Sequence, residues 1–252
     1  MQGLSLSAAL RSALHVLAAS WRRAWGALVP AVFLATVAHV LRGEALDWLI
    51  GVGAVLWSAQ AMAACYRIGL DMTAPALAGS RVTRDVPRLI VAGVLELILL
   101  AIITALMLTV VGGVAFGIAS TGKGFLAAEP ATWLPAMGQT GRTISGAVAL
   151  VGLAGVTWLR LRLSFTAAAT VDRQKVQVLS AWPLTRGRVL ASLAALVVAA
   201  APTLAVGWAL RAAGYAGAPE AIFALALAAI GVSLPLQAGL MTYLYRQSTS
   251  ST

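Results

Sequence analysis

Glu96 is the residue of this sequence with the clearest capacity for chemistry, because it interrupts an otherwise uncharged run between Leu89 and Ser120. It follows Arg88 by eight residues, which in a helix is a distance of about 12 Å along the axis. A carboxyl group inside a membrane-spanning helix must face protein or water, carry a proton, or pair with a cation. An ion or proton pathway, a polar site for a lipid headgroup and a structural contact between helices all meet this requirement.

Arg160 and Arg162 are the cations that the sequence offers to Glu96, because they end the next uncharged run on the same side of the membrane. Long arginine side chains can also extend to the membrane surface, where no partner is needed. The residues from 163 to 171 are apolar again. A helix that crossed the membrane nearer Asp172 would therefore place both arginines deep and would require a partner for them.

Motifs for catalysis, metals or phosphate are missing from the sequence. The segment GIASTGKG at 117–124 imitates a phosphate-binding loop, but Gly124 stands where that loop needs Ser or Thr to hold magnesium. Cys65 is the one cysteine, so neither a disulfide within the chain nor a Cys/His metal cluster is possible. We expect no enzyme activity, no cofactor and no metal site.

Composition places the chain in a membrane. Hydrophobic residues make up 60% of it and charged residues 10%, whereas an ordinary soluble domain has about 25% charged residues. Runs of this length and apolarity can cross hydrocarbon as helices. The predicted spans cover about 24–41, 48–66, 89–120, 143–162, 189–210 and 221–245. The sequence therefore predicts an all-α, polytopic membrane helical bundle with six transmembrane helices, in one domain over residues 1–252.

Residues 1–23 are predicted to form an amphipathic helix that lies on the membrane surface. Its apolar side chains at helical spacing are Leu4, Leu10, Leu14 and Leu17. Arg11 and His15 lie on another face of the same helix. The alternative is that this helix simply continues the first span.

The arginines and lysines predict the orientation. With a cytoplasmic N-terminus, 14 of the 18 basic residues lie inside and 4 outside, as the positive-inside rule requires. Both termini are then cytoplasmic. The aromatic and basic residues predicted to anchor the cytoplasmic face are Trp21, Arg22, Arg23, Trp182, Arg186 and Arg188. The membrane thus explains the positive charge. The sequence contains no basic run interleaved with aromatics, so we expect no nucleic-acid partner.

Small residues and prolines predict how the spans pack. Gly113 and Gly117 form a GxxxG pattern, and glycines such as Gly155 and Gly239 thin other spans, which favours close contact within the chain or between copies. Pro235 is expected to kink the last span, as Pro202 is the fifth, and each kink frees a carbonyl that a neighbouring helix must satisfy.

The segment 160–190 suggests a relative. It combines an arginine-led helix end, a Val-acidic pair and a Trp-x-Leu-Thr-x-Gly element; the matching residues are Arg162, Val171, Asp172, Trp182, Leu184, Thr185 and Gly187. This resembles poorly characterised six-span bacterial inner-membrane proteins, including the membrane domain attached to some glycerophosphodiester phosphodiesterases. Ala181 replaces the usual serine, and the expected proline between Ser164 and Val171 is absent. The resemblance implies a six-helix fold with cytoplasmic termini and no catalytic residues.

These observations predict a non-enzymatic protein of the bacterial inner (cytoplasmic) membrane. Its role would be that of an accessory or scaffold subunit, with membrane lipids, a membrane-protein partner or further copies of itself as partners. The alternative is a small-solute or lipid transporter in which Glu96 and the two arginines line a path between the kinked spans. An assembly factor that binds another membrane subunit transiently is a third reading.

Overall fold

The computed structural model describes residues 6–44, 46–72, 84–122, 126–127, 132–215 and 217–250. In these ranges the chain is almost entirely helical and has no β-strand, which confirms the predicted all-α fold. The helices are α1 (Leu6–Arg23), α2 (Trp25–Val40), α3 (Asp47–Gly69), α4 (Asp85–Ala119), α5 (Trp133–Ala136), α6 (Gln139–Arg162), α7 (Thr166–Arg173), α8 (Val189–Ala212), α9 (Pro219–Ala226) and α10 (Leu234–Thr249). Two 3₁₀ turns, η2 (Leu179–Ala181) and η3 (Pro183–Thr185), precede α8, and a π-helix, η4 (Leu227–Ser233), joins α9 to α10.

Several of these helices can cross a membrane. Within the described residues the stretches that are long and apolar enough are Asp47–Gly69, Asp85–Ala119, Gln139–Arg173, Val189–Ala212 and Pro219–Thr249. The bent pair of α1 and α2 is a sixth candidate. The prediction of a multi-pass membrane protein is confirmed.

The N-terminal helix meets the helix that follows it at a sharp bend. α1 and α2 are bent by 88° relative to each other, and the two helices together are long and apolar enough for one broken span, so both the surface helix and the continuation of the first span stay predictions. Residues 1–5 of the predicted helix lie outside the described residues.

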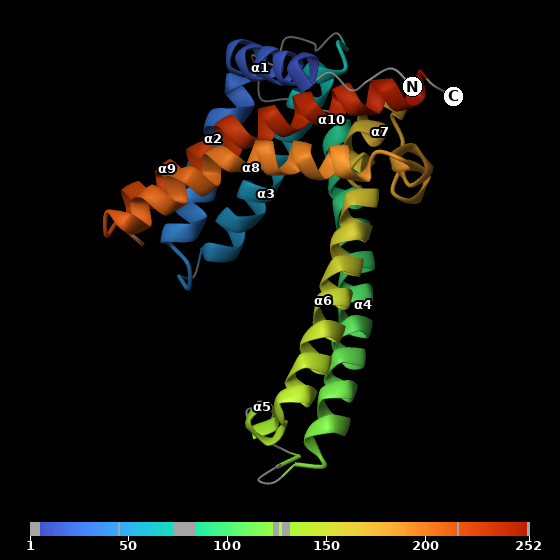
Figure 1. The fold of residues 1–252 in the computed structure, drawn as a ribbon. Helices are drawn as coiled ribbons and strands as arrows, with labels where there is room; N and C mark the ends of the chain where they lie inside the picture. Colours follow the sequence, from blue (N-terminus) through green and yellow to red (C-terminus); the bar gives the residue numbers. More distant parts are fainter. Residues whose placement is uncertain are drawn as a thin grey trace. The chain divides into compact units, whose positions relative to one another are not determined.

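The chain divides into two compact units (Figure 1). Unit 1 consists of Met1–Gly93 and Arg162–Thr252, and unit 2 consists of Val94–Leu161. The boundaries fall inside α4 and at the end of α6, so the same helices contribute to both units. The single-domain prediction is a statement about folding and stays a prediction.

In unit 1, α1 packs against α10 through small side chains. Its buried apolar residues are Ala9, Ala13, Val16 and Ala19. A Cβ atom added at Gly239 of α10 would lie 2.6 Å from the Cα atom of Ala13, so the two backbones approach closely because neither residue carries a bulky side chain. Leu14, in contrast, is 57% exposed. The face of α1 that packs inward is therefore made of small side chains, while Leu14 of the predicted apolar face points away from the bundle.

The last span is irregular where it meets α1. In an α-helix the N–H of residue 235 would donate to the carbonyl of Gly231, but Pro235 has no N–H. The indole Nε1–H of Trp21 donates to that carbonyl at 2.8 Å. The predicted release of a carbonyl by Pro235, and its satisfaction by a neighbouring helix, is confirmed.

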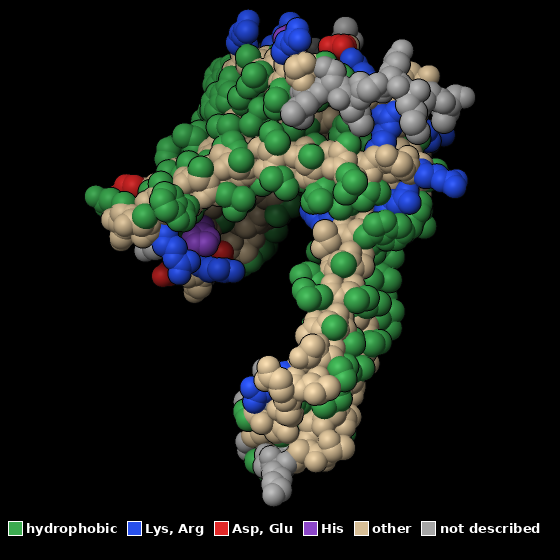
Figure 2. All heavy atoms as spheres, viewed as in Figure 1, with side chains coloured by type: hydrophobic (Ala, Val, Ile, Leu, Met, Phe, Trp, Pro, Cys, Tyr) green, Lys and Arg blue, Asp and Glu red, His purple; other side chains and the backbone are tan. Residues whose placement is uncertain are grey.

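Unit 2 is an antiparallel hairpin of α4 and α6 that lie side by side (Figure 1). Small residues of α6 face large residues of α4: a Cβ atom at Gly152 would lie 3.7 Å from Met107 and 3.8 Å from Val111, and one at Gly141 would lie 2.5 Å from Ile118. The remaining faces expose large apolar side chains such as Leu108 and Val151 (Figure 2). Such a surface suits a helix surrounded by lipid.

Candidate functional site: a charged cluster around Asp85

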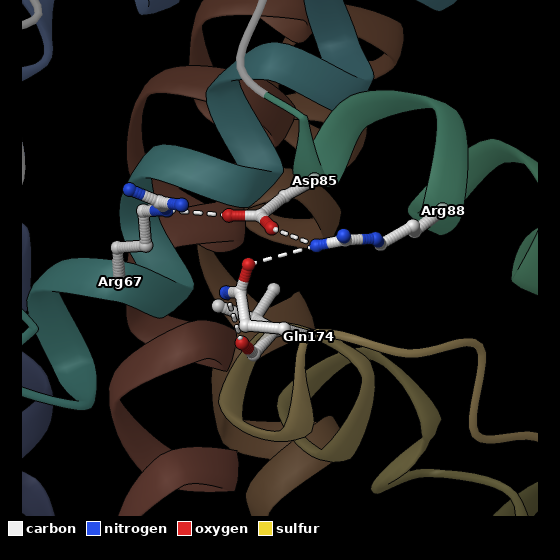
Figure 3. Close-up of polar contacts among 5 residues, drawn as sticks. Arg67, Asp85, Arg88 and Gln174 are labelled. Atoms are coloured by element: carbon white, nitrogen blue, oxygen red, sulfur yellow. Dashed lines mark hydrogen bonds and ion pairs between the residues drawn. The ribbon is translucent and has the colours of Figure 1, made fainter.

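Asp85, the first residue of α4, is a completely buried carboxylate held by two arginines (Figure 3). The Nε–H of Arg67, in the last turn of α3, donates to its Oδ2 at 2.5 Å. The Nη1–H of Arg88, one turn along α4, donates to its Oδ1 at 3.3 Å. The Arg67 side chain is only 14% exposed. Two cations thus compensate an anion that burial alone would penalise heavily.

Gln174 connects this cluster to α7. Its amide oxygen accepts a hydrogen bond from Arg88 Nη1 at 2.7 Å, and its amide nitrogen donates to the Val171 carbonyl at 2.7 Å. Gln174 follows the last residue of α7 in a left-handed conformation with φ of 55°. This geometry ends the helix and returns the side chain over its last turn. The cluster therefore fastens α3, α4 and α7 together.

Helix ends supply the local reason for this arrangement. A carboxylate at a helix N-terminus and a guanidinium near a C-terminus are each favoured by the helix dipole, and α4 begins with Asp85 where α3 ends near Arg67. This cluster was not predicted from the sequence, because 18 residues separate Arg67 from Asp85. The available signal was an aspartate at the start of a helix whose next charged neighbours, Arg84 and Arg88, are both arginines.

The other two aspartates of the predicted cytoplasmic side also have partners in unit 1. The Tyr245 hydroxyl donates to Asp172 Oδ2 at 2.7 Å, and Arg246 Nη1 donates to Asp71 Oδ2 at 2.7 Å. Tyr245 is buried and packs edge-on against Phe165 with ring centroids 6.2 Å apart. All three carboxylates are thus used to join helix ends to one another.

Glu96 and Arg160, two of the predicted site residues, meet in unit 2. Arg160 Nη1 donates to Glu96 Oε1 at 3.4 Å, and the side chains are 64% and 20% exposed, respectively. Arg162, the other predicted partner, has its guanidinium 5.9 Å from the ring centroid of Trp182, in the arrangement of a cation–π contact. The two arginines therefore have different surroundings, and any functional role of Glu96 stays a prediction.

The predicted anchors of the cytoplasmic face divide into two kinds. Arg22, Arg23 and Arg186 are exposed. Trp21 donates its indole N–H to Gly231, as described above, so this polar group is used within the bundle.

Arg188 is likewise turned inward. It donates from Nη1 to the Leu244 carbonyl at 3.1 Å and from Nη2 to the Gln247 carbonyl at 2.8 Å. Carbonyls at a helix C-terminus lack partners within the helix and attract cations. Arg188 therefore caps α10, and its role as an anchor of the cytoplasmic face stays a prediction.

Comparison of this chain with protein-family models, with curated proteins and with solved structures finds no match. Within the described residues no group of three or more His, Cys, Asp or Glu side chains is placed to hold a metal ion. The charges and contacts of the chain itself are therefore what indicate its function.

Proposed function

We propose that this protein is a non-enzymatic accessory or scaffold subunit of the bacterial inner membrane that attracts negatively charged groups to its cytoplasmic face. In this proposal both termini are cytoplasmic, and anionic lipid headgroups or an acidic surface of a membrane partner are what the face binds. The resemblance of the 160–190 segment to six-span inner-membrane proteins supports the same reading.

One observation carries the proposal: unit 1 exposes many more basic side chains than its carboxylates can offset. We call them the basic set; its members are Arg11, Arg22, Arg23, Arg84, Arg173, Lys175 and Arg186, and all are exposed. No ion pair joins any of them to a carboxylate in the part of the chain that the structure describes. Asp85 and Asp71 are already paired with Arg67 and Arg246. Asp172 accepts a hydrogen bond from the neutral Tyr245 hydroxyl and keeps its charge, but the seven basic side chains of the set far exceed it.

The opposite ends of the unit 1 helices differ in charge. There the basic Arg42 and Arg211 are accompanied by the acidic Glu44, Asp47 and Glu220, so charges of both signs mix. Figure 2 shows Lys and Arg gathered around α1 and α7, and a mixed group of both signs near the ends of α2 and α9. An uncompensated basic surface on one side attracts anionic headgroups with about 1 kcal/mol per Lys or Arg.

The test compares lipid preference between variants of the full chain in bilayer nanodiscs that contain phosphatidylglycerol and phosphatidylcholine. We expect the triple variant Arg22→Gln, Arg23→Gln, Arg186→Gln to lose several-fold of the wild-type enrichment in phosphatidylglycerol. The matched control is the double variant Arg42→Gln, Arg211→Gln, which removes charge at the mixed end and should keep the enrichment. Equal enrichment in wild type and triple variant would show that the basic set attracts no anionic lipid.

The same variants test for an acidic protein partner. Affinity purification from native membranes, followed by mass spectrometry, should recover a partner with the wild-type chain and lose it with the triple variant. If the triple variant kept both the lipid enrichment and the partner of the wild-type chain, the proposed function would be refuted.

A further inference from the structure

The Glu96–Arg160 pair lies at one end of the uncharged stretch that α4 and α6 share in the unit 2 hairpin. The contacts of Gly141 with Ile118, Gly152 with Met107, and Arg160 with Glu96 follow one another along the two antiparallel helices. In this register the uncharged stretch 143–159 of α6 runs beside about the same length of α4 beyond Glu96. Neither helix carries a charged side chain within this paired stretch.

The length of this stretch matches a bilayer. Arg142 and Arg160 stand 18 residues apart in α6, which is about 27 Å along a helix, and the hydrocarbon core is about 30 Å thick. With the paired uncharged stretch in hydrocarbon, Arg160 and Glu96 reach one headgroup boundary. If the hairpin shifted along the membrane normal, Arg160 and Glu96 would enter the hydrocarbon in place of apolar residues. Such a shift would cost several kcal/mol.

Arg160 keeps donors available at this boundary. Its contact with Glu96 uses one nitrogen at the long distance of 3.4 Å, and 64% of its side chain is exposed. A guanidinium has five N–H donors in a planar fork that matches the oxygens of a phosphate. At a headgroup boundary the abundant anion beside a helix surface is the phosphate of a phospholipid.

We propose that Arg160 binds a phospholipid phosphate at the α6 C-terminal boundary of the hairpin, and that Glu96 positions the guanidinium while competing with the phosphate for it. Anionic phospholipids are preferred over zwitterionic ones, because no headgroup ammonium competes with Arg160 for the phosphate. This site belongs to unit 2, and it does not depend on the basic set of unit 1.

The test is native mass spectrometry of the full chain released from bilayers with equal amounts of phosphatidylglycerol and phosphatidylcholine. We expect Arg160→Gln to lower the ratio of bound phosphatidylglycerol to phosphatidylcholine at least about threefold, whereas Arg160→Lys keeps most of it. Glu96→Gln should raise the ratio above the wild-type value, because the competing carboxylate is gone. Arg211→Gln, a single charge removed elsewhere, should leave the ratio unchanged.

Three results would overturn the proposal. The first is an unchanged ratio in folded Arg160→Gln protein, and the second is a reduced ratio in Glu96→Gln protein, which also decides the matter if Arg160→Gln fails to fold. The third is loss of the bound lipid to inorganic phosphate at a concentration no higher than that of the lipid, which would assign the site to free phosphate. These results are independent of the proposed function. If the unit 1 triple variant left lipid enrichment unchanged, the three results would still test the Arg160 site, because each of them concerns Arg160 or its partner Glu96.

Discussion

The carboxylates that form ion pairs with arginine in this protein differ in how far their side chains are exposed. The Asp85 side chain is 0% exposed, that of Glu96 is 20% exposed and that of Asp71 is 72% exposed. An exposed ion pair contributes little, because water and salt screen it and two long side chains lose freedom. Removal of one partner from a buried pair leaves an uncompensated charge and costs several kcal/mol. Burial, more than the presence of an ion pair, therefore decides which contact matters for stability.

Asp85→Asn is expected to destabilise the protein strongly. The substitution keeps the shape of the side chain but leaves Arg67 and Arg88 without their buried counter-charge. The free energy of unfolding should fall by about 3 kcal/mol, at the lower end of the range for buried pairs because Arg88 is partly exposed. Chemical unfolding of the purified protein in detergent measures this difference. Asp71→Asn is the matched control and should change the unfolding free energy by less than about 1 kcal/mol; equal effects of the two variants would contradict the argument.

At the scale of elements, helix contacts in this bundle depend on which glycines face another helix. Gly239 of α10 lies against Ala13 of α1, and Gly69 of α3 lies against Thr242 of α10. Gly155 of α6 and the GxxxG pair Gly113 and Gly117 of α4 have no atom of the chain within 4 Å of an added Cβ. Glycines that look equivalent in the sequence therefore have different roles, and only some of them set the distance between helices.

Gly239→Ala should separate α1 from α10, whereas Gly155→Ala should be tolerated. The added methyl group at 239 would meet Ala13 Cα at 2.6 Å and Val16 Cβ at 3.1 Å. Such overpacking costs about 1–3 kcal/mol. At 155 the methyl group enters open space and improves helix propensity by up to about 1 kcal/mol. Unfolding in detergent followed by circular dichroism would measure both, and a Gly239→Ala protein as stable as wild type would refute the close contact.

At the scale of the whole molecule, the charge distribution predicts its orientation in the membrane. The basic set lies on unit 1, together with the aspartates that fasten helix ends, while the opposite ends of these helices carry mixed charges. Translocation of Lys and Arg across a membrane is disfavoured, so the side that is rich in them stays cytoplasmic.

Reporter fusions should read this orientation directly. Fusions after Gly43, Gly122 and Gly217 are expected to report the outer compartment, and a fusion after Ser250 the cytoplasm. Alkaline phosphatase and green fluorescent protein reporters give opposite signals on the two sides and serve as mutual controls. A cytoplasmic signal from any of the first three positions would contradict the six-span topology. A cytoplasmic signal after Gly43 would in particular contradict a topology in which α1 lies on the cytoplasmic side and α2 crosses the membrane.

The prediction of membrane helices succeeded from sequence because the cost of placing a segment in hydrocarbon is close to a sum over its own residues. The uncharged runs at 48–66 and 189–210 accordingly fall within α3 and α8. The carbonyl released by Pro235 was predictable for the same local reason, because the missing N–H is a property of proline itself.

The tertiary structure alone decided which side chains meet. Asp85 meets Arg67 across 18 residues of chain, Arg188 donates to the Gln247 carbonyl at the end of α10, and Glu96 pairs with Arg160 rather than Arg162. Each of these depends on the angle and register at which two helices pack, which a local count of charges and apolar residues does not contain. Helix identity therefore followed from transfer energies along the chain, whereas the charged contacts followed from distances between helices in space.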